Sequence, residues 1–209
     1  MDKLEKDGLL SSNIVDFYTT WATEQSNRMT SKKSKAFPTG FIRSLLENPP
    51  VVTKQTSSFI NEMNRVGGFF FYYFFYENQP GEWALFEYDA VKDRFSYYFN
   101  NRKSANQEET IHKFLRVSSA LRHLFNNINM TTKNYNFKEE LDLPSCEDPA
   151  ETGLFSLEFF RRRIFGLEIR KESVTIKDVQ HLKKTILEVS KSTPMRLSMS
   201  FSRDNSRIG

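Results

Sequence analysis

The chain has 209 residues, the length of a single domain that can bury a core without disulfide support. Its 30 Lys and Arg residues against 26 Asp and Glu residues leave a formal net charge of +4, which is too small an excess to indicate a nucleic-acid partner. The single cysteine, Cys146, excludes an internal disulfide framework and a structural zinc site built on several cysteines, and it fits a reducing compartment. Aromatic residues make up 14% of the chain, which excludes disorder over its whole length because each can bury a large apolar area.

The N-terminus and the apolar segments indicate no membrane attachment. The first residues carry charges with no apolar stretch behind them, so they do not read as a signal peptide. The longest apolar run, residues 69–76, is far shorter than the roughly 20 residues of a membrane-spanning helix. We therefore expect a soluble, intracellular protein.

The N-terminal part predicts a helix, a loop and a second, short helix. Four apolar residues recur at three- and four-residue spacing behind capping residues at 11–13, which predicts an amphipathic helix. These residues are Ile14, Phe17, Tyr18 and Trp21. Residues 26–35 are polar and basic without an apolar period and predict an exposed loop. A short helix is expected around residues 38–46, before the Pro49-Pro50 pair.

An aromatic run and two shorter segments predict three consecutive strands. Residues 69–76 are continuously aromatic, which is typical of a strand covered on both faces and makes this segment the candidate for the centre of a sheet. Residues 83–88 and 95–99 follow after turns and complete a strand meander.

The C-terminal half predicts three helices and one strand. Residues 108–128 carry an apolar stripe that includes Phe114, Leu115 and Leu121. Residues 135–143 indicate an edge strand, and residues 153–165 a helix buried against the sheet. Residues 175–190 predict the last helix, with Thr175 as its cap and Asp178 three residues on. This order of elements is typical of an α+β protein.

We divide the chain into three parts. Residues 1–8 are an N-terminal extension, residues 9–190 form one folded domain, and residues 191–209 form a basic, Ser-rich tail. The tail has no apolar period, so we expect it to be disordered.

The sequence predicts neither a cofactor nor a metal. The three histidines, His112, His123 and His181, lie in predicted helices, and none has a second histidine or a carboxylate at a metal-binding spacing. No glycine-rich phosphate-binding motif occurs.

Three consecutive arginines leave a nucleic-acid partner as an alternative. Arg161, Arg162 and Arg163 lie in the helix predicted over residues 153–165, and with the basic loop over residues 28–35 they could contact phosphates. Three consecutive residues fan over more than half of a helix circumference, so they cannot all face one partner. Such a nucleic-acid-binding module would bind in a steeply salt-dependent way.

Five segments carry a resemblance to a known family. They are the helix opening at residues 10–18, the buried strand at 69–76 followed by Glu82-Trp83-Ala84-Leu85, the strand end Tyr97-Tyr98-Phe99, the helix start Thr152-Gly153, and the closing helix at 178–186. In this order they resemble the Ulp/SENP-type cysteine proteases, which remove SUMO and NEDD8, over most of residues 9–190. The resemblance implies a papain-like α+β fold, with a central mixed sheet packed between the first helix and the helix that begins near Gly153.

The catalytic positions implied by the resemblance are degenerate. The general-base histidine falls on Glu82, the orienting aspartate on Phe99, the nucleophilic cysteine on Thr152 and the oxyanion-hole glutamine on Cys146. A thiol protease needs a thiolate formed beside an imidazole that a carboxylate orients. The resemblance therefore implies a catalytically inactive member.

The resulting hypothesis is a pseudoprotease that acts as a protein-interaction or scaffold module. Its partner would be a ubiquitin-like protein or a subunit of a complex, whose C-terminal tail would lie across Glu82, Trp83, Thr152 and Gly153. A buried core position at the start of a strand is the other interpretation of Trp83. The family and the basic tail suggest a nuclear location.

An active protease is the remaining alternative. Cys146 would be a displaced nucleophile with Glu82 as its base, although a carboxylate lacks the pKa match of an imidazole near neutral pH. A second version would place the base at His112 or His123.

Overall fold

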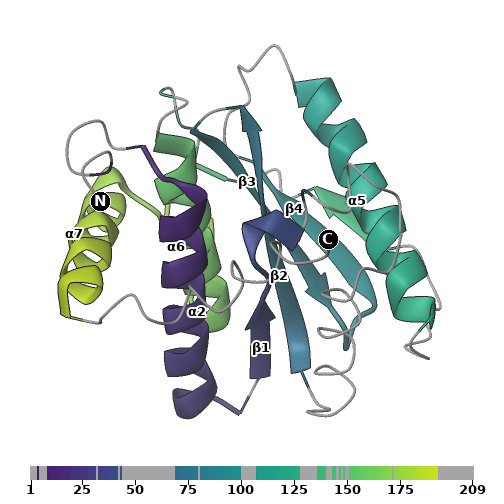
Figure 1. Cartoon of the computed structure of the whole chain (residues 1–209), viewed down its shortest axis with the longest axis horizontal. Coiled ribbons are helices and arrows are strands. Elements are labelled where there is room, and N and C mark those ends of the chain that lie inside the picture. Colours follow the sequence, from purple (N-terminus) through teal and green to yellow (C-terminus); the bar gives the residue numbers. More distant parts are fainter. Residues whose placement is uncertain are drawn as a thin grey trace, which may run out of the picture.

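A five-stranded mixed sheet forms the centre of the described structure (Figure 1). The computed structural model describes residues 4, 9–31, 33–41, 43, 69–79, 81–99, 107–127, 136–139, 143, 144, 146, 148, 151–170 and 172–192. In sheet order the strands are β1 (Lys33–Ala36), β2 (Phe69–Gln79), β3 (Glu82–Asp89), β4 (Arg94–Tyr98) and β5 (Asn136–Glu139). Strands β2, β3 and β4 form an antiparallel meander, and β1 and β5 join its edges parallel to β2 and β4. The predicted α+β class and mixed sheet are confirmed.

Helices cover both faces of this sheet. They are α2 (Ser12–Met29), α5 (Gln107–Asn127), α6 (Thr152–Ile164) and α7 (Ile176–Ser192). Helices α2, α6 and α7 lie on one face and α5 on the other (Figure 1). The expectation that the sheet lies between the first helix and the helix near Gly153 is therefore wrong. Helices α2 and α6 pack against each other on the same face, where the Ser26 hydroxyl donates a hydrogen bond to the Ile164 carbonyl at 2.7 Å.

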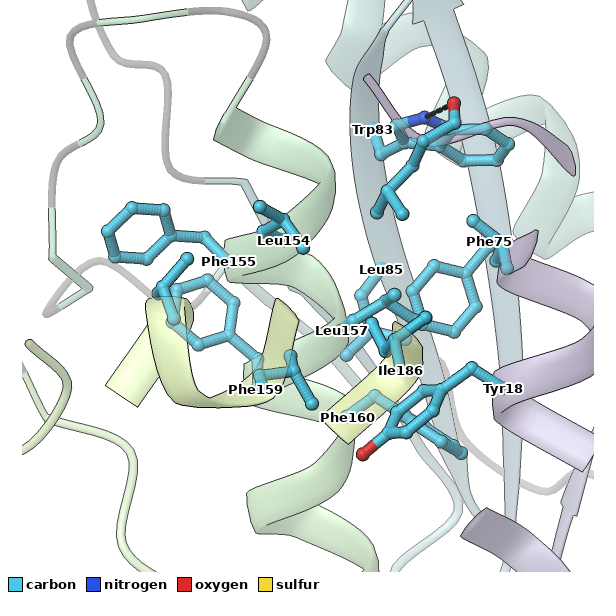
Figure 2. Packing of buried hydrophobic residues seen from close by; sticks show 14 of the residues in the cluster. Tyr18, Phe75, Trp83, Leu85, Leu154, Phe155, Leu157, Phe159, Phe160 and Ile186 are labelled. Atoms are coloured by element: carbon cyan, nitrogen blue, oxygen red, sulfur yellow. Dashed lines mark hydrogen bonds between the residues drawn. The ribbon is translucent and has the colours of Figure 1, made fainter. Parts of the chain in front are cut away.

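Each face of the sheet has its own hydrophobic core. The main core joins the sheet to α2, α6 and α7, and the second core joins it to α5. Main-core residues include Tyr18, Phe75, Trp83, Leu85, Leu157, Phe159, Phe160 and Ile186 (Figure 2). Second-core residues include Phe74, Phe86, Tyr97, Phe99, Phe114 and Leu121. Successive residues of a strand point to opposite faces, so a strand buried on both sides is continuously apolar.

Strand β2 is covered on both faces as predicted, but it is not the middle strand. Tyr73 and Phe75 belong to the main core, whereas Tyr72 and Phe74 belong to the second core. The middle position belongs to β3, all of whose residues are buried. β2 is the second strand from one edge, because the unexpected strand β1 pairs with its outer side while β4 and β5 extend the sheet beyond β3.

The segment predicted as an exposed loop over residues 26–35 contains the end of α2 and most of β1. The strand was not predicted because its sequence is polar. β1 is a short edge strand that carries lysines, which is common at a sheet edge. The Asn27 side chain takes the place of a neighbouring strand: its Nδ2 donates to the Ser34 carbonyl at 2.8 Å, and its Oδ1 accepts from the Ser34 N–H at 2.7 Å. The backbone of Ser34 is thereby satisfied at the sheet edge.

The other predicted elements occur close to their expected positions. Residues 39–41 and 43 are helical, as expected for the short helix at 38–46. Residues 42 and 44–46 lie outside the described part of the chain. Leu115 is an exception within α5, because its side chain is 46% exposed instead of buried with the stripe. At the start of α7, the Thr175 hydroxyl accepts from the Asp178 N–H at 3.4 Å and the Asp178 carboxylate accepts from the Thr175 N–H at 2.8 Å, which confirms the predicted cap.

Candidate functional site

The first residue of α6 contacts the first residues of β3. The Thr152 hydroxyl donates a hydrogen bond to the Gly81 carbonyl at 3.2 Å and accepts one from the Trp83 N–H at 2.9 Å. The two backbone groups lie on either side of Glu82, so the structure brings the Glu82 and Thr152 positions to one junction. Gly81 has a φ of +84°, which a glycine adopts without strain and which turns the chain into β3. We call this contact between the starts of β3 and α6 the junction.

Close packing at Gly153 holds the junction together. A Cβ atom on Gly153 would lie only 2.7 Å from Cδ1 of Trp83 and 2.9 Å from Cδ1 of Leu10. The Trp83 side chain is 1% exposed, and its indole N–H donates to the Leu10 carbonyl at 3.3 Å (Figure 2). The Ser156 hydroxyl donates to the Trp83 carbonyl at 3.0 Å and adds a second link between α6 and β3.

The four residues expected to contact a partner are buried. Thr152 is 0% exposed and Glu82 is 3% exposed, and Gly153 and Trp83 are covered as well. A hydroxyl that already donates one hydrogen bond and accepts another at a buried position acts as a bridge between backbone segments. The junction is thus built as a structural contact.

Phe99 lies on the opposite face of the sheet from the main core. Its ring is buried and stacks on Tyr97, with centroids 5.9 Å apart and an interplanar angle of 14°. It belongs to the second core with Phe86 and Phe114. A phenyl ring has no hydrogen-bonding atom, so it cannot orient a base.

Cys146 lies near the start of α6 with a protonated thiol. Its Sγ donates to the Asp148 carbonyl at 2.8 Å and lies 3.8 Å from Oε2 of Glu151, the residue before α6. Burial, together with the neighbouring acidic groups of Glu151 and Asp148, raises the pKa of the Cys146 thiol to about 12. At neutral pH the thiol therefore carries its proton, which is the inert form of a cysteine.

The histidines do not assemble a base beside Cys146 within the described residues. The side chains of His112 on α5 and His181 on α7 are exposed. His123 belongs to α5, but its side chain lies outside the described part. Among the described residues, no group of three or more His, Cys, Asp or Glu side chains is placed to hold a metal ion.

A small open pocket, with a cavity volume of about 20 Å³, lies beside Trp83. It is lined by Ser12, Thr39, Arg43, Tyr76, Glu77 and Trp83. Asp16 of α2 fixes one wall, because its Oδ1 accepts from the Thr39 N–H at 2.7 Å and its Oδ2 from the Thr39 hydroxyl at 3.2 Å. Burial raises the pKa of Asp16. Of these lining residues only Trp83 was found from the sequence, because the others come from separate segments without a shared motif.

The three consecutive arginines are bound to buried carboxylates. Arg161 donates from two nitrogens to Glu158, at 2.8 and 2.7 Å, and Arg162 donates to the same carboxylate at 2.8 Å. Arg163 forms a two-pronged pair with Glu87 of β3, at 2.7 and 2.6 Å. Both carboxylates are fully buried. The arginine charges are therefore used inside the protein, which disfavours the nucleic-acid interpretation.

No helix in the described part of the chain combines the length and the apolar character needed to cross a bilayer. This agrees with the short apolar runs in the sequence.

Comparison with known proteins places this geometry in a structural class. No family model and no curated protein matches the sequence. Among solved structures, SUMO protease Ulp1 with its catalytic cysteine oxidised to a sulfenic acid has a TM-score of 0.67 and 14% identity, covering 90% of this chain and 79% of that chain. The C-terminal Ulp1 protease domain in complex with Smt3, the yeast ortholog of SUMO, has a TM-score of 0.63 and 12% identity, with 87% and 76% covered.

A third structure is similar over the same extent. The catalytic domain of the Ulp1-like SUMO protease of Chaetomium thermophilum has a TM-score of 0.60 and 13% identity, covering 87% of this chain and 71% of that chain. Identities this low establish the architecture alone. The chain therefore has the fold of the Ulp/SENP-type SUMO proteases.

Proposed function

We propose that the chain is a catalytically inactive module of the SUMO-protease fold that binds a protein partner without cleaving it. The partner class that the fold favours is a ubiquitin-like protein with an extended C-terminal tail. One of the similar structures is a complex with Smt3, the yeast ortholog of SUMO, which motivates this choice. An intracellular and nuclear location is part of the same proposal.

The state of Thr152 is the observation that carries the proposal. Its hydroxyl is fully buried and engaged with the backbone at Gly81 and Trp83, on either side of Glu82. A nucleophile needs an adjacent base and an accessible reacting atom. Neither condition is supported at this position, because the Thr152 hydroxyl is fully buried and Glu82 offers no imidazole.

The pocket beside Trp83 supports binding. It lies next to the junction and combines an aromatic wall with the guanidinium of Arg43 and the hydroxyls of Ser12 and Thr39. The pocket is small, at about 20 Å³, so an extended peptide segment would lie across its opening and contact these groups from outside. The tail of a bound protein would lie against this pocket and stop before the covered Thr152.

A protease that uses Cys146 is the weaker alternative. Its thiol is buried, hydrogen-bonded to the Asp148 carbonyl and next to the acidic Glu151. A pKa of about 12 opposes formation of the thiolate at neutral pH. A low-pKa, accessible cysteine would be required for that mechanism.

Titration calorimetry with mature SUMO tests the proposal. We expect binding to the full chain and a loss of about tenfold or more in affinity for Arg43→Glu. This substitution reverses the charge of the side chain and changes its shape at the pocket wall. Arg28→Glu is the matched control, because Arg28 is an exposed arginine at the end of α2 and does not line the pocket. No binding of SUMO, NEDD8 or ubiquitin would contradict the proposal, as would equal losses in the two variants.

A further inference from the structure

The chain just before α2 covers the junction. Leu9 lies against Gly81, where an added Cβ would be 2.6 Å from Cδ2 of Leu9. Leu10 lies against Gly153, with its Cδ1 2.9 Å from the position of an added Cβ. The two glycines are the residue before Glu82 and the residue after Thr152. Leu9 and Leu10 together therefore contact both sides of the junction, and we call them the cover.

The cover is held mainly by apolar contacts. Among the described residues, its polar link to the junction is the 3.3 Å hydrogen bond from the Trp83 indole to the Leu10 carbonyl. Leu10 is buried in the main core, and Leu4, earlier in the chain, is also fully buried there. Leu9 is only partly buried. A segment with few polar links can open locally at a smaller free-energy cost than unfolding the domain.

We propose that Leu9 and Leu10 form an intramolecular cover that closes the Thr152 position to peptides and reagents, so that a partner's tail reaches only the pocket beside Trp83. This inference rests on the proposed function, because it concerns how far the tail of a bound protein can advance. While the cover is closed, a tail cannot reach the buried Thr152 hydroxyl. Local opening of the cover would expose that position without unfolding the sheet.

Alkylation of a cysteine placed at position 152 tests the cover. The variant is Thr152→Cys with Cys146→Ser, which makes position 152 the one cysteine in the chain. In the reaction with iodoacetamide, the thiol first loses its proton to the buffer. The thiolate sulfur then displaces iodide and forms a thioether. We expect slow alkylation in the native protein and full alkylation in urea, as measured by intact mass.

Adding Leu9→Ala should raise the native alkylation rate about tenfold. Without the leucine side chain against Gly81, local opening of the cover costs less free energy. Leu115→Ala is the matched control, since Leu115 is an exposed leucine on α5, across the sheet from the junction. Rapid native alkylation before any change at Leu9 would overturn the cover. So would a rate that Leu9→Ala leaves unchanged.

A second readout serves if Thr152→Cys fails to fold. The chain has two tryptophans, so Trp21→Phe leaves Trp83 as the single indole fluorophore. Acrylamide should quench Trp83 weakly, and the addition of Leu9→Ala should increase the quenching constant several-fold. An equal constant in both proteins would overturn the cover.

Neither readout requires a partner, which separates the two proposals. Failure of mature SUMO to bind would remove the proposed function while the alkylation result still decides whether the cover exists. If SUMO binds and position 152 is open, the cover alone is wrong.

Discussion

The two ends of α6 are attached to the sheet by different chemistry. At its N-terminal end, the Thr152 hydroxyl and the close approach of Gly153 to Trp83 join the helix to β3. At its C-terminal end, Arg163 pairs with the buried Glu87 of the same strand. The first attachment uses uncharged hydrogen bonds and packing, and the second uses an ion pair. The difference teaches that packing and uncharged hydrogen bonds hold the start of the helix, whereas a buried charge pair holds its end.

The largest effect is expected from breaking the charged attachment. Arg163→Ala leaves the Glu87 carboxylate buried without its cation, which should lower the free energy of unfolding by about 3–5 kcal/mol. Urea unfolding measures the change. Arg170→Ala is the control, because its ion pair with Glu168 is exposed and should contribute less than about 1 kcal/mol. Equal losses in the two variants would mean that burial of Glu87 does not determine the strength of this attachment.

The packed attachment should be weaker but sensitive to a single methyl group. Gly153→Ala places a Cβ 2.7 Å from Trp83, so the free energy of unfolding should fall by about 1–3 kcal/mol through overpacking. Gly40→Ala is the matched control, since nothing lies within 4 Å of its added Cβ. Thermal unfolding of the two variants provides the comparison. A Gly153→Ala protein as stable as Gly40→Ala would show that the close approach is not required.

Removing the hydroxyl at the junction should have a somewhat smaller effect. Thr152→Val keeps the shape of the side chain but leaves the Trp83 N–H without its 2.9 Å acceptor, at a cost of about 1–2 kcal/mol. Thr152→Ser retains the hydroxyl and should recover most of the loss. If valine and serine give the same unfolding midpoint in urea, the hydroxyl does not hold the junction.

The smallest effect concerns the cap of α7. Hydrogen bonds from Thr175 lower the pKa of Asp178 below its usual value of 3.8. A lowered pKa means that the carboxylate stabilises the folded state at neutral pH and loses this contribution as the pH falls through the folded-state value. Asp178→Ala should therefore reduce stability by about 1 kcal/mol near pH 7, with the difference shrinking in acid. A difference from the native chain that stays constant down to strongly acidic pH would contradict the cap.

Sequence patterns predicted the elements whose side chains reveal their surroundings. The aromatic run of β2 indicated burial on both faces, and the apolar residues at 153–165 indicated the buried helix α6. Strand β1 was not predicted, because its edge position and its pairing with Asn27 require no apolar side chains. The placement of α2 and α6 on one face was not predicted either, because the apolar stripe of a helix does not indicate which side of a sheet it covers.

The site was predictable in part. The resemblance brought Glu82, Trp83, Thr152 and Gly153 into one hypothesis, and the structure joins their segments at the junction. Their burial could not be read from the sequence, because Leu9 and Leu10 carry no sign that they cover two glycines more than 70 residues away. The ion pair between Arg163 and Glu87 could not be predicted either, because it depends on which residue of β3 faces α6.

The most direct test of binding without cleavage is mass spectrometry of the full chain with SUMO that carries a thiol-reactive group at its C-terminus. Spectra are recorded under native and then denaturing conditions. Our account predicts a complex in the native spectrum that separates completely into the two intact proteins on denaturation. A covalent adduct at Cys146 would contradict it, because that product requires a docked tail beside a reactive thiolate.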